Sequence, residues 1–495
     1  MSDIRAGRRE WVGLAVLAIP SLLVSIDLFV LLLAMPRITA DLRAGATEQL
    51  WIIDTYGFLL SAFLITMGAL GDRIGRRRLL FLGAAAFGGA SVLAAYATDP
   101  LLLIAARALL GVAGAAIGPT TLALISGMFR DPRQRATAIG VWLVSLMGGS
   151  AVGPVVGGVL LAHFWWGSVF LLAVPAMVLL LALGPVLLPA DRRAGRAPLD
   201  LVSVGLSLAA ILAAVYGIKE LARYGFAPLP SAALAAGAAI GVVFARRQRT
   251  LAHPLLDVAL FRASTARTAL GGMLVNTMLP GATMVLITQY LQLVAGFTPL
   301  RAGLAMLPAV VTGIVAVQAA PLAARRVRPA PLIAAGLAAS AAGLVLVAST
   351  DSVVGMVAGL GLVNAGAGPL VTLGTGIVIA ALPPEKAGSA ASVSQTGNEF
   401  GFALGVAVLG SVAAAVYRHG APPEAPDGIV PGLPSAALDQ ARDAYVDGLH
   451  VVAALSAVAL LTLALLVLRS FRDLRPIGAP DQPTATRDNP VATPG

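Results

Sequence analysis

Long apolar stretches separated by short polar loops run through almost the whole chain. A helix needs about 20 mostly apolar residues to cross the hydrocarbon core of a membrane. Only 12% of the 495 residues are charged and the mean hydropathy is +0.88, whereas soluble chains carry about 25% charged residues. The pattern predicts an all-α polytopic membrane protein with fourteen spans, at residues 11–36, 50–70, 79–97, 101–128, 137–161, 166–188, 200–222, 229–246, 266–293, 300–322, 329–349, 352–381, 387–416 and 447–468.

The connections between these stretches are short, so we expect one membrane domain without a soluble module. Residues 1–10 form a basic N-terminus, and the first apolar stretch is too long for the core of a signal peptide, which predicts a retained first span. The longest loop, 418–446, ends in a segment, 435–445, for which we expect a short surface helix. The polar, Pro-rich tail 469–495 is expected to be disordered.

Basic residues gather in alternate loops. With the N-terminus assigned to the cytoplasm, 26 Lys and Arg side chains lie on the cytoplasmic side and 6 on the outer side. Cytoplasmic loops carry an excess of Lys and Arg. We therefore expect both termini in the cytoplasm, and the net charge of +10 needs no nucleic-acid partner. Almost all of these basic residues are Arg, which suggests a GC-rich bacterial source. We therefore expect the spans to lie in the bacterial cytoplasmic membrane.

Several classes of protein are disfavoured by residues that are absent or scattered. The chain has no Cys and only four His, at His163, His253, His419 and His450, without metal-ligand spacing. No nucleophile–base pair and no phosphate-binding loop of the form GxxxxGK[ST] are present. We expect neither a metal, a cofactor nor a catalytic site, and no direct drive by ATP.

One offset, 252 residues, aligns two pairs of segments. The loop 69–76 matches 321–328, and the glycines at 149, 153 and 158 match those at 401, 405 and 410. Transporters are often built from repeats that leave weak internal similarity of this kind. The offset predicts two six-helix bundles, 11–188 and 266–468, with two helices inserted by the segment 189–265. The second loop has Ala324 where the first has Asp72.

Four charged residues inside predicted spans are candidates for a functional role, because ionisable groups there are costly and usually functional. They are Asp27, Asp54, Arg107 and Glu399. A helix rise of about 1.5 Å per residue puts the first three roughly 13, 6 and 9 Å from the outer ends of their spans, and Glu399 closest to the midplane. Asp27 is the first candidate for a coupling acid, because a cation that displaces its proton is exchanged for that proton. The alternative is a structural ion pair with Arg107.

Two of these acids lie on polar or aromatic helix faces. Glu399 shares a face with Gln395 and Ser392, at spacings of four and seven residues. This polar stripe predicts a substrate or proton site facing a cavity, with hydrogen bonding between helices as the alternative. Asp54 shares a face with Trp51 and Phe58, which suits a lipophilic cation through charge and cation–π attraction. Trp51 also suits a membrane interface.

Four segments together resemble one family. Gly68-Ala-Leu-Gly-Asp-Arg-Ile-Gly-Arg76 and the arginines that follow resemble the cytoplasmic loop motif of the major facilitator superfamily, and Arg107-Ala-Leu-Leu-Gly111 resembles its buried-arginine motif. Gly149-Ser-Ala-Val-Gly-Pro-Val-Val-Gly157 is similar to the motif of its antiporters. Leu50-Trp-Ile-Ile-Asp-Thr-Tyr56 resembles the start of helix 2 in the fourteen-span drug:proton antiporter-2 family. The resemblance implies the major facilitator fold, two six-helix bundles plus two inserted helices.

The resemblance also implies roles. Asp72, Arg73 and Arg76 would act as a gate, with Asp72 pairing across the bundle interface. The antiporter motif would comprise Gly149, Gly153, Pro154 and Gly157, for which close helix packing is the alternative. Phe29, Ala173 and Gln395 depart from the family pattern, which is expected to alter the drug spectrum and not the fold.

These features together favour a proton-coupled antiporter that exports lipophilic cationic or amphipathic drugs across the cytoplasmic membrane. Its partners would be the substrate, protons and membrane lipid. Two alternatives stay open. The first is a dedicated exporter of one endogenous metabolite or antibiotic, which Phe29 and Gln395 support. The second is a lipid-translocating envelope protein.

Overall fold

A computed structural model of the chain describes residues 6–190, 200–224, 227–251, 254–256, 258–261, 263–383, 386–424, 429, 434–472 and 474. The helices are α1 (Arg8–Leu42), α2 (Ala46–Ile74), α3 (Arg76–Ala95), α4 (Pro100–Met128), α5 (Pro132–His163), α6 (Ser168–Leu171), α7 (Ala173–Leu187), α8 (Leu201–Tyr224), α9 (Pro228–Gln248), the 3-10 helix η1 (Val258–Phe261), α10 (Ser264–Leu293), α11 (Pro299–Ala323), α12 (Pro329–Val347), α13 (Val353–Ala380), α14 (Ala387–Gly420) and α15 (Ser435–Ser470).

The all-α membrane fold predicted from hydropathy is confirmed. Within the described residues, thirteen helices are long and apolar enough to cross a membrane by length and composition, α6 and α7 counting as one. A further helix, α5, has 32 residues. There is thus a long helix at each of the fourteen predicted places. The tail predicted to be disordered lies outside the described residues from 475 onward.

Two helices are longer than predicted. α1 continues past the apolar stretch and through Pro36 to Leu42, and Arg43 ends the helix with a left-handed φ of 53°. Residues 435–445 form no separate surface helix. They are the first three turns of α15, a single helix of 36 residues, so the loop before it is shorter than predicted. Both extensions are polar ends of helices whose apolar parts were identified correctly.

The ends of several spans follow from local chemistry. Asp99, Asp131, Thr298 and Ser352 precede α4, α5, α11 and α13, and each side chain accepts a hydrogen bond from a backbone N–H of the first turn. Such caps satisfy donors that the helix itself cannot pair. Proline follows three of the four caps, at the position where its missing N–H costs nothing.

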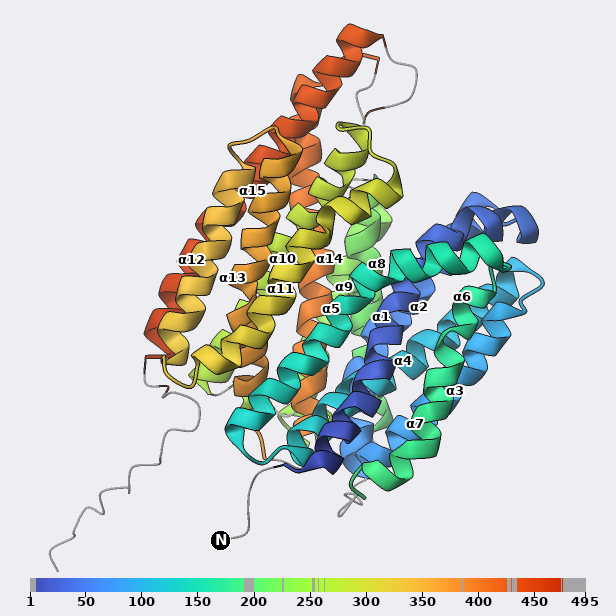
Figure 1. The fold of residues 1–495 in the computed structure, drawn as a ribbon, viewed down its shortest axis with the longest axis vertical. Coiled ribbons are helices and arrows are strands. Elements are labelled where there is room, and N and C mark those ends of the chain that lie inside the picture. The colour runs from blue at the N-terminus through green and yellow to red at the C-terminus, as the bar shows by residue number, and fades with distance from the viewer. Residues whose placement is uncertain are drawn as a thin grey trace, which may run out of the picture.

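The helices form two bundles that the chain traverses in turn (Figure 1). The first comprises α1 to α7 and the second α10 to α15, as their mutual contacts show. Adding 252 to the first residues of α3 and α4 gives 328 and 352, and α12 and α13 begin one residue later, at 329 and 353. The offset found in the sequence therefore relates helices of one bundle to helices of the other.

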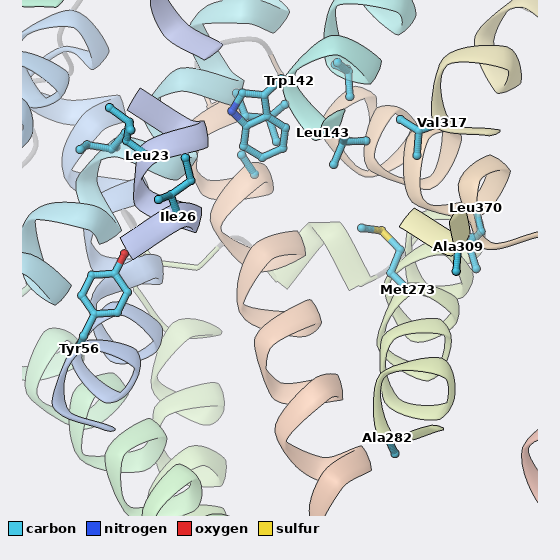
Figure 2. Packing of buried hydrophobic residues seen from close by; sticks show 14 of the residues in the cluster. Leu23, Ile26, Tyr56, Trp142, Leu143, Met273, Ala282, Ala309, Val317 and Leu370 are labelled. Atoms are coloured by element: carbon cyan, nitrogen blue, oxygen red, sulfur yellow. The ribbon is translucent and has the colours of Figure 1, made fainter. Parts of the chain in front are cut away.

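Two pairs of helices make the most extensive contacts between the bundles, and α4 and α13 also contact helices of the opposite bundle. α2 packs on α14, and α5 packs on α11. Because α11 and α14 are the repeat partners of α2 and α5, these two contacts are equivalent to each other, and we call them the α2/α14 seam and the α5/α11 seam. One continuous apolar core includes buried residues from both bundles, among them Ile26, Trp142, Met273 and Val317 (Figure 2).

The inserted helices α8 and α9 pair with each other, and α8 also contacts α2 and α14. The start of α8 is tied to the end of α9, since Arg247 donates two hydrogen bonds to Asp200, at 2.8 and 3.1 Å. Hydrogen bonds from Arg247 hold the pKa of the Asp200 carboxyl well below its usual range. The inserted pair therefore lies against the α2/α14 seam.

Candidate functional site

A buried ion pair lies in the middle of the first bundle. Arg107 of α4 donates a short hydrogen bond to the carboxylate of Asp27 on α1, and their side chains are 0% and 10% exposed. Arg107 also donates to the carbonyl of Ile52 at 3.1 Å, and its guanidinium lies 4.5 Å from the ring centre of Tyr56. The ion pair that the sequence left as an alternative is therefore present. A coupling role for Asp27 stays a prediction.

α1 ends fifteen residues after Asp27, about 22 Å along the helix, because the helix continues as a polar extension beyond residue 36. Asp27 thus lies near the middle of its helix, where a charge with no partner would be costly. Its position explains why the structure supplies Arg107 as a partner.

The glycines of α5 bring this helix close to the part of α1 that carries Asp27. A Cβ atom on Gly149 would lie 2.5 Å from the Ser25 side chain and 2.8 Å from the backbone nitrogen of Ile26. A Cβ on Gly157 would lie 2.9 Å from Val30. Gly153 is buried in the same helix, and the backbone of Pro154 is helical. The proposed antiporter motif is therefore a packing surface for α1 that holds Asp27 in place.

Gly149→Ala is expected to destabilise the protein by about 1–3 kcal/mol, the usual cost of overpacking a close contact. The added methyl would meet backbone atoms of α1, which cannot move aside as a flexible side chain can. Gly158→Ala is a matched control, because nothing lies within 4 Å of its Cβ position. Thermal unfolding of the purified variants in detergent measures the difference, and equal midpoints would contradict the packing role.

The predicted polar stripe on α14 runs along the α2/α14 seam. Ser392 is completely buried, and a Cβ on Gly68 of α2 would lie 2.6 Å from its Cβ. Gln395 fills the space beside Gly118 of α4, where a Cβ would lie 2.6 Å from its amide nitrogen. Glu399, one turn further along, is exposed. The stripe therefore passes from a closed contact at Ser392 and Gln395 to an accessible position at Glu399.

Phe400, the residue after Glu399, packs on an apolar cluster that Ala62 of α2 forms with Ile211 and Val215 of α8. Glu399 therefore lies on the part of α14 that meets α2 and α8. A role for Glu399 in substrate or proton binding remains a prediction.

The aromatic group predicted around Asp54 is present on α2. The rings of Trp51 and Phe58 lie edge to face, 6.4 Å apart, on the same side of the helix. Trp51 is exposed near the start of α2, as an interfacial residue would be, whereas Asp54 is half-buried. The geometry is compatible with both readings of Trp51, so the substrate role of Asp54, Trp51 and Phe58 remains a prediction.

Asp72 connects the bundles at one end of the molecule. Its carboxylate accepts hydrogen bonds from the backbone nitrogens of Gly388 and Ser389, at 3.1 and 2.9 Å, and from the Ser389 hydroxyl at 3.1 Å. These are groups of the first turn of α14, which has no capping side chain of its own. Asp72 of α2 therefore caps a helix of the other bundle, as the resemblance implied.

Two arginines surround this cap. Arg76 donates to Asp72 at 3.0 Å and to the carbonyl of Ala123 at 3.5 Å, which ties α3 and α4 to the same place. Arg73 lies within the electrostatic influence of Asp200 at the start of α8. The predicted gating residues Asp72, Arg73 and Arg76 thus lie together, beside the inserted helices. Their gating role stays a prediction.

Some contributors to the site were not assigned a role from the sequence. Tyr56 packs its ring on Arg107, although only its place in the motif was noted. The indole nitrogen of Trp142 donates to Ser21 and Thr121, at 3.0 and 3.1 Å, and so links α5 to α1 and α4. The only sequence feature that could have identified Tyr56 and Trp142 is that each is a polar aromatic residue inside a predicted span. The described residues hold no group of three or more His, Cys, Asp or Glu side chains able to bind a metal.

Two helical bundles joined at two equivalent seams, with a buried ion pair inside the first bundle, define a polytopic membrane transporter. The chain belongs to the Major Facilitator Superfamily, whose sequence model matches residues 17–406. The resemblance to that superfamily is confirmed. Membership of its fourteen-span branch stays a prediction.

Relatives support the same assignment. The chain is 40% identical to the multidrug efflux pump LfrA of Mycolicibacterium smegmatis, over 95% of this chain and 98% of that protein. It is 37% identical to the methyl viologen resistance protein SmvA of Salmonella typhimurium, over 81% and 82% of the two chains, and 36% identical to the puromycin resistance protein pur8 of Streptomyces alboniger, over 86% and 87%. The crystal structure of the human organic anion transporter MFSD10 shares the fold, with a TM-score of 0.64, 14% identity and coverage of 92% and 99%.

Proposed function

We propose that this transporter is a proton-coupled antiporter that exports lipophilic cationic or amphipathic drugs. The observation that carries the proposal is the buried Asp27–Arg107 pair near the middle of α1, and Glu399 of α14 supplies an exposed acid on the other bundle. The relatives named for multidrug efflux and for resistance to methyl viologen and puromycin support a drug as substrate. The proposal includes no enzymatic step.

The orientation follows from the basic loops. The starts of α1, α3 and α5 and the ends of α2 and α4 lie at one end of the molecule, which carries Arg73, the arginines at 76–78 and those at 130, 133 and 135. We assign this end, called the basic end below, to the cytoplasm of a bacterial cell. The Asp72 cap lies at the basic end, so the conformation described here is closed toward the cytoplasm.

In this antiport, the carboxylates of Asp27 and Glu399 bind either a proton or a drug cation. When the transporter opens to the outside, Asp27 or Glu399 takes up a proton, which weakens the attraction that holds a cationic drug and favours its release. When it opens to the cytoplasm, a drug cation competes with that proton for the same carboxylate. A ligand shifts such an equilibrium only through different affinities for the two states. Proton entry and drug exit are thereby linked.

Reconstitution in proteoliposomes tests the proposal. An imposed pH gradient should drive accumulation of a fluorescent lipophilic cation against its concentration gradient, and addition of the drug should in turn alter the internal pH. Liposomes without protein and a proton ionophore serve as controls. Movement of lipid probes without either signal would favour the envelope-protein alternative.

A dedicated exporter of one metabolite or antibiotic is the second candidate. One observation favours it, because Gln395 is neutral and fills a close space beside Gly118, where little room remains for varied ligands. A susceptibility panel in a host that lacks its own pumps separates the two candidates. Resistance to several unrelated cations supports the multidrug function, and resistance to a single compound class supports the dedicated one.

Asp72→Asn is expected to lower the maximal transport rate severalfold with little change in substrate affinity. The substitution removes the charge that caps α14 across the seam, and caps contribute about 0.5–2 kcal/mol. Asp72 lies far from the Asp27 pair along α2, so it acts on conformational balance. Asp131→Asn is the matched control, since Asp131 caps α5 within its own bundle. Strongly weakened drug binding at an unchanged maximal rate would contradict the gating role.

A further inference from the structure

The α5/α11 seam has a contact that the sequence motifs do not mark. Gln318 of α11 seats its side chain against Gly140 of α5, and a Cβ at Gly140 would lie 2.6 Å from the Gln318 amide oxygen. Both residues lie toward the basic end, about five and eight residues from the ends of their helices. Because Gly140 has no side chain, Gln318 can occupy the space beside it while this seam is closed.

The Gln318 amide oxygen is buried and has no hydrogen-bond partner. A buried acceptor without a partner is unfavourable, because it has lost its water and gained nothing in exchange. The closed seam thus contains a group that becomes satisfied when the bundles part and water enters. The Gln318 side chain fills the closed seam by packing against Gly140, whereas its amide oxygen without a partner destabilises the closed state.

The repeat-related position on the other seam has the same property. Subtracting 252 from Gln318 gives Thr66 of α2, whose hydroxyl is also buried without a partner. Adding 252 to Gly140 gives Ser392 of α14, which is fully buried. One seam pairs a large side chain with glycine, and the other has Thr and Ser at the same two places. A polar group without a partner thus recurs at equivalent positions of both seams.

We infer that Gln318 is a positioning residue of the cytoplasmic gate. Its side chain closes the α5/α11 seam by occupying the space at Gly140, and its amide oxygen keeps the closed state from becoming too stable. Gln318 then sets the fraction of transporters that open toward the cytoplasm. This inference needs only the alternating opening of the two bundles, and it does not depend on which drug or ion is carried.

The chain has no cysteine, so the alkylation rate of a single introduced thiol measures how often the gate opens, with no reaction from other thiols. Ser392→Cys places that thiol in the α2/α14 seam, where it is 0% exposed and reacts with a maleimide only when the gate opens. The reporter lies in the seam opposite Gln318, so it detects opening of the whole gate and no local change beside the substitution. The Ser392→Cys protein is the reference for every rate below, so the comparison does not assume that this substitution leaves transport unchanged.

Two substitutions should shift this reaction rate in opposite directions. Gln318→Met keeps the shape and removes the amide, so we expect the alkylation rate to fall about fivefold. Gly140→Ala pushes the Gln318 amide out of its space, so the rate should rise about threefold. Val315→Met is the control on the same helix, because Val315 is 60% exposed on its outer surface and should change nothing.

A transport measurement completes the test. Both variants should alter the maximal rate of drug export with less than about a twofold change in the drug concentration at half-maximal rate. Shifts in the same direction for Gln318→Met and Gly140→Ala, or no shift in either, would overturn the inference and leave Gln318 as a packing residue. Folding is checked by thermal unfolding, and Gln318→Met carries the test if Gly140→Ala folds poorly.

Discussion

Asp27→Asn is expected to abolish drug accumulation driven by a proton gradient. Asn has nearly the shape of Asp but takes up no proton, so the exchange of drug for proton loses its carrier. Uphill transport in proteoliposomes under an imposed pH gradient measures the effect, and the loss should exceed about a hundredfold if Asp27 alone couples the two fluxes. Uphill transport at a normal level of folded protein would remove Asp27 from the mechanism.

The ion pair complicates a single substitution, because Arg107 is fully buried. Removing one partner of a buried pair costs about 3–5 kcal/mol, since the other charge is left without compensation. The double variant Asp27→Asn with Arg107→Met removes both charges and should restore the folding yield. If the pair is only structural, this variant also restores uphill transport. If Asp27 carries the proton, the protein folds and coupled transport stays absent.

Glu399→Gln is expected to weaken export of cationic drugs at least about tenfold, while neutral amphipathic drugs lose much less. The attraction between a carboxylate and a cation at 4 Å is about 4 kcal/mol at an effective dielectric near 20, and exposure of Glu399 reduces it. A loss of about 1.4 kcal/mol already gives a tenfold change in affinity. Transport of both drug classes is measured in the same vesicles.

Asp439→Asn is a matched control for this test, because Asp439 is an acid of the same bundle. Its side chain is 71% exposed, and its ion pair among the contacts described is with the neighbouring Arg442. It should leave both drug classes unchanged. An equal loss for cationic and neutral drugs in Glu399→Gln would indicate a proton carrier or a structural residue. An unchanged rate for both would place Glu399 outside the transport pathway.

Most of the fold was predictable because the membrane permits few solutions. Without water in the hydrocarbon core, backbone groups must pair within each helix, so apolar length alone identifies the spans. Polar helix ends carry no such signal. The last turns of α1 and the first turns of α15 extend beyond the apolar region. The sequence predicts a loop for the first of these segments and a separate surface helix for the second, because both are polar.

The site was predictable in its charged members and less so in its contacts. Asp27, Arg107 and Asp72 stand out because a charge inside or beside a span needs a reason. Gln318 and Tyr56 are neutral, and nothing in a single sequence says which of many helices they face. Gly140 was hidden among 54 glycines, and only the position of α11 distinguishes it from the rest.

On the repeat-related seam, the position equivalent to Asp72 is the buried Ala324, and Arg325 donates one hydrogen bond to Thr137 of α5 at 3.5 Å. The Asp72 carboxylate accepts three hydrogen bonds from α14 at 2.9 to 3.1 Å, and the longer single bond of Arg325 is weaker than these. The two seams of the closed basic end therefore resist separation unequally. The contacts across the α2/α14 seam are stronger than those across the α5/α11 seam. We therefore expect α5 and α11 to separate first when a drug enters from the basic end.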